Sequence, residues 1–348
     1  MATEEELRLR AHGPMVTGTR PDQPIIQVDG LTRRFGSLEA VRGISFTVWP
    51  GEIFGFLGPN GAGKSTTINM LCTLLRPTSG HAMVAGYDVV TQQSQVRASI
   101  GLIFQDPSLD ERLTAIENLR FHAAVYGLPR QQAARRAEEV LRMVELWDRR
   151  DTLVRTFSGG MKRRLEIARG LMHYPRVLFL DEPTIGLDPQ TRQHLWSYIL
   201  ALRQREGITM FLTTHYMDEA EHADRIAIMD HGQIIALDTP DGLKAMVGGD
   251  VIRLKTTDDA TAARELAAAL GLAPRQDQEG IMFEARSGEE LVPRLVELVS
   301  PRILSISVRR PTLDDVFIKL TGHEIRDEEA SGRDRMRAMI QRRSGRGR

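Results

Sequence analysis

The stretch GPNGAGKST, residues 58–66, decides the fold class of this chain. It matches the pattern G-x4-G-K-[ST], with the apolar run IFGFL before it and TTINMLCTLL after the Lys-Ser pair. We therefore expect a strand, a phosphate-binding loop and a helix, in that order. Glycines let the backbone turn tightly and aim N–H groups at phosphate oxygens, and the helix N-terminus adds a favourable partial charge. The stretch predicts a nucleotide-binding α/β domain.

The positions of this loop have expected roles. The Lys64 ammonium group is expected to reach the β- and γ-phosphates, and the Ser65 hydroxyl to ligate Mg²⁺. The residues expected to contact the nucleotide are Gly58, Pro59, Asn60, Gly61, Ala62, Gly63, Lys64, Ser65 and Thr66. The alternative interpretation is an ordinary glycine-rich turn from a strand to a helix. The coincidence of strand, loop, lysine and hydroxyl favours the phosphate site.

A second apolar run, VLFLDEP at residues 177–183, ends in two acids. A carboxylate at the end of a buried strand is costly unless it meets a cation, and ligands bind at the carboxyl edge of a parallel sheet. Asp181 is therefore a candidate partner of Mg²⁺ through water. Glu182 is a candidate general base that would polarise an attacking water. The alternative interpretation is a helix N-cap followed by Pro183.

The composition is that of an ordinary globular protein of about two domains. The 348 residues are 41% apolar and 26% charged, with 46 basic and 46 acidic side chains. The zero net charge argues against bulk binding to nucleic acid. Cys72 is the only cysteine, which excludes a disulfide framework and a cysteine-based zinc site within one chain. Because no run approaches 18 apolar residues and the first 13 residues lack the apolar core of a secretory signal, we expect neither a membrane span nor secretion.

Changes of pattern divide the chain into segments. Residues 1–23 are expected to be a flexible tail. Within 24–248, strand-like runs alternate with helices, which predicts a parallel sheet covered by helices and an antiparallel β layer at its start. Strand signals vanish between Leu113 and Arg155, which indicates a helical insertion, and we place this helical subdomain at about 106–170. Residues 250–322 predict a small α+β domain in the order β-α-β-α-β-α, and 323–348 a disordered basic tail.

The segment SGGMKRRLEIARGL, residues 158–171, strongly resembles the signature motif of ABC-type ATPases. Its place after the helical insertion and before VLFLDEP is the one the family shows. Ser158 is expected to cap a helix that Gly159 and Gly160 open. Met161 stands where the family usually has Gln, and Phe157 where it usually has Leu, but the Ser-Gly-Gly centre is intact. The alternative is simply a capped amphipathic helix, whereas the resemblance implies a P-loop ATPase of ABC type that binds ATP and Mg²⁺.

Further residues resemble single positions of the ABC family. Gln105 resembles the glutamine that touches Mg²⁺ and the attacking water, and Asp188 resembles the aspartate of the D-loop. His215 resembles the switch histidine at the γ-phosphate, and Phe35 stands where the family places an aromatic ring that stacks on adenine. Each has a structural alternative: a loop glutamine, an N-cap for the helix starting near Pro189, a structural histidine and a core phenylalanine.

The chain also resembles one subgroup of the family, the daunorubicin-resistance-type ATP-binding subunits. This resemblance rests on QDPSLDERLTAIENL (105–119), SGGMKRRLEIARGLMHYP (158–175) and PTLDDVFIKLTG (311–322). In the subgroup the C-terminal domain is associated with assembly and with the membrane partner, so 250–322 is expected to serve assembly or regulation. Without the resemblance, the segment 311–322 indicates only the start of a helix, with Thr312 as the cap and Asp314 and Asp315 in the first turn.

The resemblance implies an ATPase subunit that works as a homodimer and acts on a separate membrane permease. Each ATP would lie between the phosphate loop of one copy and Ser158-Gly159-Gly160 of the other, and Glu182 would activate the attacking water. The expected function is export of a drug or another hydrophobic molecule, with no nucleic-acid partner. Two alternatives stay open: a soluble ABC ATPase of DNA repair or translation, and a nucleotide-binding regulatory module without turnover.

Membrane attachment is expected to be peripheral, on the cytoplasmic face, and through the permease. Ala2 stands where myristoylation requires Gly, and the chain has no C-terminal prenylation cysteine. The competing anchor is the tail from Arg333 to Arg348, whose seven arginines would give salt-sensitive binding to an anionic surface.

Overall fold

The computed structural model describes residues 23–105, 108–277, 279–285 and 288–322. These form two compact units, one ending at Ile235 and the other beginning at Ala236. Apart from Gln23, the two expected tails, 1–23 and 323–348, lie outside the described residues. Within the described part of the chain, no helix is long and apolar enough to cross a bilayer. The predicted α/β class is confirmed.

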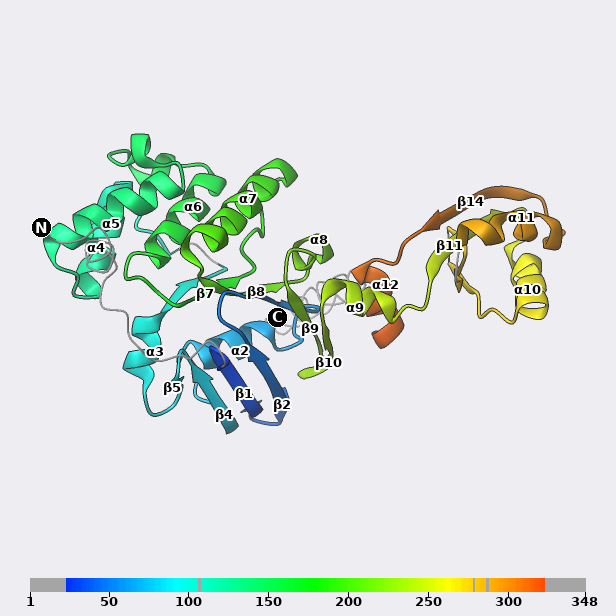
Figure 1. Ribbon diagram of the computed structural model, residues 1–348, viewed down its shortest axis with the longest axis horizontal. Helices are drawn as coiled ribbons and strands as arrows, with labels where there is room; N and C mark the ends of the chain where they lie inside the picture. Colours follow the sequence, from blue (N-terminus) through cyan, green and yellow to red (C-terminus); the bar gives the residue numbers. More distant parts are fainter. Residues whose placement is uncertain (1–22, 106–107, 278, 286–287, 323–348) are drawn as a thin grey trace, which may run out of the picture. The chain divides into compact units, whose positions relative to one another are not determined.

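The first unit is built on a largely parallel sheet with the strand order β10-β9-β3-β8-β7-β6 (Figure 1). The strands of this sheet are β3 (Ile53–Leu57), β6 (Ile100–Ile103), β7 (Val177–Asp181), β8 (Thr209–Thr214), β9 (Arg225–Asp230) and β10 (Gln233–Asp238), of which β10 continues past the end of the first unit at Ile235. β3 pairs in parallel with β8 and β9, and β7 pairs in parallel with β6 and β8. Every residue of β3, β7 and β8 is buried, as their apolar runs predict. The loops after these three strands therefore meet at one edge of the sheet.

The predicted antiparallel layer is present in the order β2-β1-β4-β5. It consists of β1 (Ile26–Phe35), β2 (Leu38–Val48), β4 (Ser79–Val84) and β5 (Tyr87–Asp88), and buried and exposed side chains alternate at the start of β1. Phe46 of β2 lies against the rings of Phe54, Phe56 and Phe211, which belong to the parallel sheet. Helix α2 (Lys64–Leu71) contacts strands of both layers. The helix that follows the phosphate loop is thus held from two sides.

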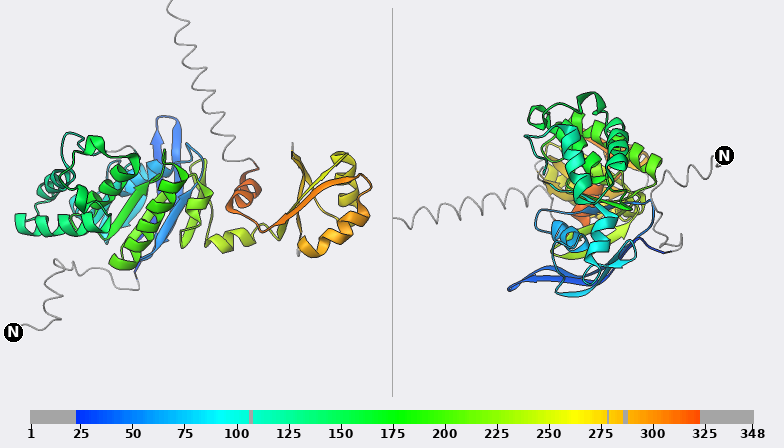
Figure 2. Two further views of the ribbon diagram at one scale, coloured as in Figure 1. Left: turned by 90° about the horizontal axis from the view of Figure 1, so that it is seen from above. Right: turned by 90° about the vertical axis from the view of Figure 1, so that its left-hand side faces the viewer.

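Helices replace strands between β6 and β7, as predicted. They are α4 (Ala115–Val125), α5 (Arg130–Met143) and α6 (Gly159–Gly170), with short 3₁₀ turns at Trp147–Arg149 and Val154–Thr156. Helix α4 begins in a capping box in which Thr114 and Glu117 bond each other's backbone N–H groups. Helix α3 (Gln93–Ser99) precedes β6, and α7 (Pro189–Glu206) and α8 (Met217–Ala220) follow β7 and β8. Figures 1 and 2 show α4 and α5 on the side of the unit away from β1 and β2.

The second unit contains one strand that the sequence pattern did not predict. After α9 (Pro240–Ala245) come β11 (Asp250–Thr256), α10 (Asp259–Leu270), β12 (Arg275–Asp277), β13 (Gly280–Ala285), α11 (Gly288–Leu298), β14 (Ile303–Arg309) and α12 (Leu313–Thr321). The added strand, β12, turns the expected order into β-α-β-β-α-β ahead of α12. The sheet order β12-β13-β11-β14 is antiparallel throughout, which is the ferredoxin-like arrangement. Ile252, Leu254, Leu266 and Phe283 are in its core.

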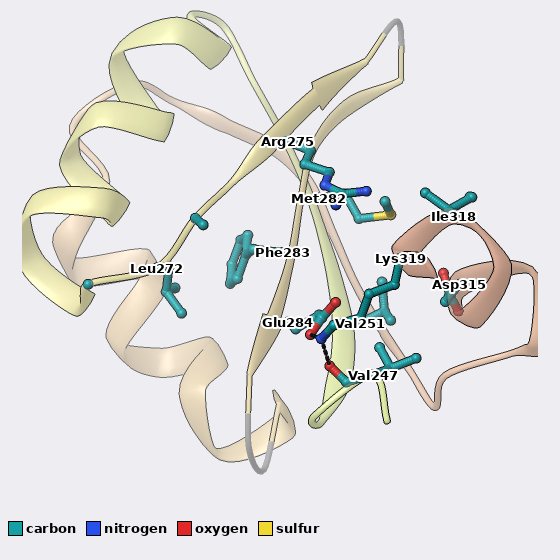
Figure 3. Close-up of a pocket in the computed structure, with 12 residues that line it drawn as sticks. Val247, Val251, Leu272, Arg275, Met282, Phe283, Glu284, Asp315, Ile318 and Lys319 are labelled. Atoms are coloured by element: carbon teal, nitrogen blue, oxygen red, sulfur yellow. Dashed lines mark hydrogen bonds and ion pairs between the residues drawn. The ribbon is translucent and has the colours of Figure 1, made fainter. Parts of the chain in front are cut away.

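Helix α12 closes a cleft of about 350 Å³ within the second unit (Figure 3). Val251 and Phe283 line it from the sheet, and Ile318 lines it from α12. The Lys319 ammonium group donates to the carbonyl oxygen of Val247 and to Glu284 Oε2, both at 2.6 Å. Helix α12 also packs on α9. These contacts tie the segment before the Gly248-Gly249 pair to the C-terminal sheet, so the compact units divide upstream of that pair.

Candidate active site

The predicted phosphate loop joins β3 to α2 at the carboxyl edge of the parallel sheet. Its backbone requires glycine at two positions: Gly63 has a φ of +106°, and a Cβ on Gly58 would lie 2.1 Å from the carbonyl oxygen of Met229. The Lys64 side chain is 4% exposed, and its Nζ donates to the carbonyl oxygens of Gly58 and Pro59 at 2.7 and 3.0 Å. The ammonium group therefore lies over the loop whose N–H groups suit phosphate oxygens.

Asp181 ends β7 and lies beside the loop's serine. Ser65 Oγ donates to Asp181 Oδ1 at 3.2 Å, and Thr213 Oγ1 donates to the same oxygen at 2.5 Å. Burial raises the pKa of Asp181, although the hydrogen bonds from both hydroxyls and the Lys64 charge oppose the rise. A cation next to this carboxylate would relieve the cost of burying its charge.

The donors at this point fit Mg²⁺. A serine hydroxyl and a carboxylate are hard oxygen ligands, and Mg²⁺ commonly takes one or two of these from the protein and the rest from water and substrate phosphates. Among the described residues, no group of three or more His, Cys, Asp or Glu side chains is placed to hold a metal ion.

Glu182 faces the loop lysine and His215. Its Oε1 lies 3.7 Å from Lys64 Nζ and 3.4 Å from His215 Nδ1. Burial favours the neutral acid, but the nearby His215 and Lys64 side chains outweigh it and hold the pKa of Glu182 below its usual range. The carboxylate is thus ionised at neutral pH, the state that a general base requires.

The backbone at Glu182 excludes the N-cap interpretation of the two acids. Glu182 has a φ of +46°, a left-handed conformation that is uncommon for a residue with a Cβ and recurs at functional sites. The next helix, α7, begins only at Pro189, and its N-cap is Asp188, whose Oδ1 accepts from Thr191 N at 3.0 Å. The structural alternative for Asp188, an N-cap of this helix, is therefore present, and it does not test the resemblance to the D-loop aspartate.

The signature segment begins α6 as predicted. Ser158 is the N-cap, and its Oγ accepts from Met161 N at 3.3 Å. Gly160 has a close neighbour on α7, because a Cβ there would lie 2.5 Å from Thr191 Cγ2 and would force this side chain to shift. The signature thus lies against the helix that Asp188 caps, with Ser158 and Gly159 exposed.

Two predicted residues lie at the margin of the site. Gln105 follows β6 at the same sheet edge, with an exposed side chain that makes no hydrogen bond among the described residues. Phe35 ends β1 and is 45% exposed, so it is not a core phenylalanine. The Arg33 guanidinium lies 4.5 Å from the centre of its ring. The exposed ring is available for stacking, as an adenine contact requires.

The comparisons with known proteins agree with this geometry. The ABC transporter family model matches residues 41–185. The daunorubicin/doxorubicin resistance ATP-binding protein DrrA of Streptomyces peucetius is 42% identical, over 91% of this chain and 99% of its own length. This chain belongs to the ABC transporter family. It is an ATP-binding subunit of that family and an ATPase, and the predicted resemblance to the daunorubicin-resistance subgroup is confirmed.

Further ABC proteins extend the comparison. The linearmycin resistance ATP-binding protein LnrL of Bacillus subtilis is 39% identical over 87% of this chain and all of its own length. A dimeric ATP-binding cassette, MJ0796, in a post-hydrolysis state bound to ADP and Pi has a TM-score of 0.55 and 26% identity, and the match covers 62% of this chain and 98% of that one. Nothing in these comparisons favours the alternative of DNA repair or translation.

One arginine of this ABC ATPase site is not evident from the sequence. Arg163, on α6, is 6% exposed. Its guanidinium donates to the carbonyl oxygens of Asp181, Glu182 and Pro183 at 3.2, 3.3 and 2.6 Å. The signature helix is therefore bonded directly to the backbone of the expected base. In the sequence the run KRR, residues 162–164, looks like an exposed basic patch, and only the fold reveals the burial.

The same arginine reaches the segment that carries Gln105. It donates to the carbonyl oxygen of Phe104 and pairs with Glu166 Oε2 at 2.9 Å. Glu166 is fully buried, and its Oε1 accepts from the backbone N–H of Ser108 at 2.9 Å. The Arg163–Glu166 pair thus joins α6 to the chain on both sides of residues 106–107.

Proposed function

We propose that this chain is the ATP-hydrolysing subunit of an exporter that moves a drug or another hydrophobic molecule through a separate membrane permease. The observation that carries the catalytic part is the position of Glu182, which lies between Lys64 and His215 at the end of β7. The names of the relatives, which refer to resistance to daunorubicin, doxorubicin and linearmycin, support the class of cargo.

The residues divide the work of binding ATP. The phosphates bind the loop from Gly58 to Thr66, where backbone N–H groups and Lys64 neutralise their charge. Phe35 stacks on adenine. Ser65 and Asp181 hold Mg²⁺ directly or through water, with Gln105 as a further contact, and the bound ion would neutralise charge on the β- and γ-phosphates.

Hydrolysis uses the side chains around Glu182. Water attacks the γ-phosphorus in line with the bond to the leaving oxygen of ADP, and Glu182 accepts a proton from that water. His215 contacts the γ-phosphate and holds it in place. This arrangement favours turnover over the alternative of a regulatory module without hydrolysis.

We also propose that two copies of the chain bind ATP between them. Ser158, Gly159 and Gly160 of one copy would bind the γ-phosphate held by the loop of the other, because the N-terminus of α6 offers N–H groups to an anion. Asp188 accepts a hydrogen bond from Thr191, whose side chain lies against Gly160. Asp188 therefore belongs to the same proposed interface. ATP then bridges the dimer, and hydrolysis removes the bridge, so that the copies separate and the helical insertion moves. The dimeric cassette bound to ADP and Pi supports the pairing of two copies.

The permease is proposed to dock on the helical insertion at the cytoplasmic face of the membrane. Helix α4 exposes two large apolar side chains one turn apart, Phe121 at 68% and Val125 at 66%, and exposed apolar patches of this kind mark interaction sites.

The domain arrangement is proposed to be an ATP-binding domain at 24–248 and an assembly or regulatory domain at 250–322.

The central test replaces the base. We expect Glu182→Gln to bind ATP normally but to hydrolyse it two to four orders of magnitude more slowly, roughly the contribution of a positioned base. Because the bridging γ-phosphate persists, the variant should also accumulate as an ATP-bound dimer. Phosphate release and size-exclusion chromatography with ATP measure the two effects. Turnover close to that of the wild type would remove Glu182 from this role.

A further inference from the structure

A buried carboxylate with no assigned role lies next to Glu182 and His215. Glu219 is on α8, the short helix after His215, and it is 1% exposed. Its Oε2 accepts from Thr214 Oγ1 at 2.8 Å, and its Oε1 accepts from Thr184 Oγ1. Thr214 directly precedes His215, and Thr184 follows Glu182 in the next turn. The carboxylate therefore bridges the two strand ends that carry the expected base and switch histidine.

A third element contributes to this bridge. Arg192, in the first turn of α7, places its Nε 3.8 Å from Glu219 Oε1, and its guanidinium lies 4.1 Å from the centre of the Tyr216 ring. Asp188 caps the same helix. The Glu219 carboxylate is thus contacted by Thr184 in the loop after Glu182 and by Arg192 in the helix that follows this loop.

We propose that Glu219 is a positioning residue that clamps the loop after Glu182 to the strand end carrying His215, and so sets the geometry between these two side chains. The inference rests on the roles proposed above for Glu182 and His215. Among the described residues, no hydrogen bond or ion pair joins Glu219 to the phosphate loop, so the clamp acts on turnover rather than on ATP affinity. A misplacement of about 1 Å at a reacting group costs on the order of 100-fold in rate.

The protonation of Glu219 gives the clamp a pH dependence. Burial raises the pKa of Glu219 to about 7, against the opposing effects of the Thr214 hydrogen bond and the charges of Arg192 and His215, while Glu182 adds to the rise. Arg192 faces Glu219 from α7, His215 from the end of β8 and Glu182 from the end of β7. Above pH 7 the ionised carboxylate accepts from both threonines and attracts Arg192. Below pH 7 the neutral acid loses that attraction and one acceptor, so the clamp weakens as the pH falls.

The test compares Glu219→Gln with the wild type in steady-state ATP hydrolysis by the full chain from pH 6 to pH 8.5. The amide has nearly the same shape but no charge at any pH. We expect kcat to fall roughly 10- to 100-fold, with KM for ATP within about twofold of the wild type. The fall of kcat as the pH drops through about 7 should be present in the wild type and absent in the variant. Glu221→Gln, an exposed carboxylate two residues further on, is the matched control and should behave as the wild type.

A second pair of variants keeps the proposal testable if Glu219→Gln does not fold. Thr184→Val removes the hydroxyl at nearly constant volume and should lower kcat several-fold, whereas Thr184→Ser keeps the hydroxyl and should retain kcat. In combination with Glu219→Gln, Thr184→Val should add little, because both remove the same contact.

The outcomes separate the clamp from the catalytic assignment. The clamp would be overturned if Glu219→Gln had the kcat and the pH profile of the wild type. If Glu219→Gln does not fold, the same result for Thr184→Val would overturn it. So would a rise in KM at unchanged kcat. An active Glu182→Gln would instead overturn the base assignment on which the clamp depends.

Discussion

Lys64 and Glu182 place opposite charges 3.7 Å apart where both side chains are almost fully buried. Each stabilises the charged form of the other, because an unpaired charge is costly at such a position. The lysine therefore has two consequences for the site. It offers a cation to the phosphates, and it helps to keep the Glu182 carboxylate ionised although burial alone would raise its pKa.

Removing this lysine should affect both ATP binding and turnover. We expect Lys64→Ala to weaken ATP binding by at least tenfold, because charge-assisted hydrogen bonds are worth about 1.5–3 kcal/mol. Hydrolysis should be lost. Equilibrium binding of a fluorescent ATP analogue and phosphate release measure the two effects.

Lys244→Ala is the matched control for this change. Lys244 pairs with the exposed Asp241 in the second unit, and such surface pairs contribute little. Nucleotide affinity and turnover should therefore match the wild type in this variant. Equal affinities for Lys64→Ala and the wild type would contradict the phosphate site.

At the scale of elements, α6 is bonded to the ends of two neighbouring strands. Arg163 donates to the backbone after β7 and after β6, and Glu166 neutralises it. A guanidinium has five N–H donors in a rigid plane, which suits several carbonyl oxygens that point at one spot. This arginine therefore fixes the signature helix directly against the backbone of Glu182.

Two substitutions separate the charge of Arg163 from its hydrogen bonds. Arg163→Lys keeps the charge but cannot reach every acceptor, so we expect a folded protein with kcat lowered roughly tenfold, as for other small misplacements. Arg163→Met leaves Glu166 buried and unpaired, which should cost about 3–5 kcal/mol of the free energy of unfolding. Urea unfolding and phosphate release measure these effects.

A compensating change checks the cause of the lost stability. Arg163→Met combined with Glu166→Gln should recover part of it, because no buried charge is then unpaired. If Arg163→Met unfolds at the same urea concentration as the wild type, the buried pair does not hold α6 in this way.

At the scale of the whole molecule, attachment to the membrane tests the proposed partner. Expressed alone, the protein should stay in solution or be released by moderate salt, because arginine contacts with lipid are screened. Expressed with its permease, it should remain with the membrane in high salt, since apolar packing of α4 is not screened in this way. Fractionation at increasing salt measures the difference. Salt-resistant binding without any permease would point to a direct lipid anchor.

The exposed face of α4 provides the matched variants for this experiment. Phe121→Ser with Val125→Ser should release the protein from permease-containing membranes while its own ATP hydrolysis continues. Val296→Ser removes an apolar side chain that is 57% exposed on α11 of the second unit, and it should leave attachment unchanged. If Val296→Ser released the protein from the membrane as completely as Phe121→Ser with Val125→Ser, attachment would not depend specifically on α4.

The sequence by itself determined the chemistry of the site and most of the elements around it. The loop from Gly58 to Thr66 is contiguous, and its backbone geometry follows from local residue types, so phosphate binding is predictable without a fold. The helical insertion and the caps at Ser158 and Asp188 are local for the same reason. Resemblance to one family then assigned roles to Gln105 and His215, which local patterns alone leave ambiguous.

Only the tertiary structure decided which distant polar side chains are buried together. Arg163 and Glu219 resemble ordinary surface residues of a helix in the sequence, because local pattern does not reveal what packs over a helix face. Strand β12 has three residues, too few for a periodic signal, and its pairing with β13 is what makes the second unit ferredoxin-like. The common cause is that these features depend on contacts between segments far apart in the chain, and such contacts exist only once the strands and helices have come together.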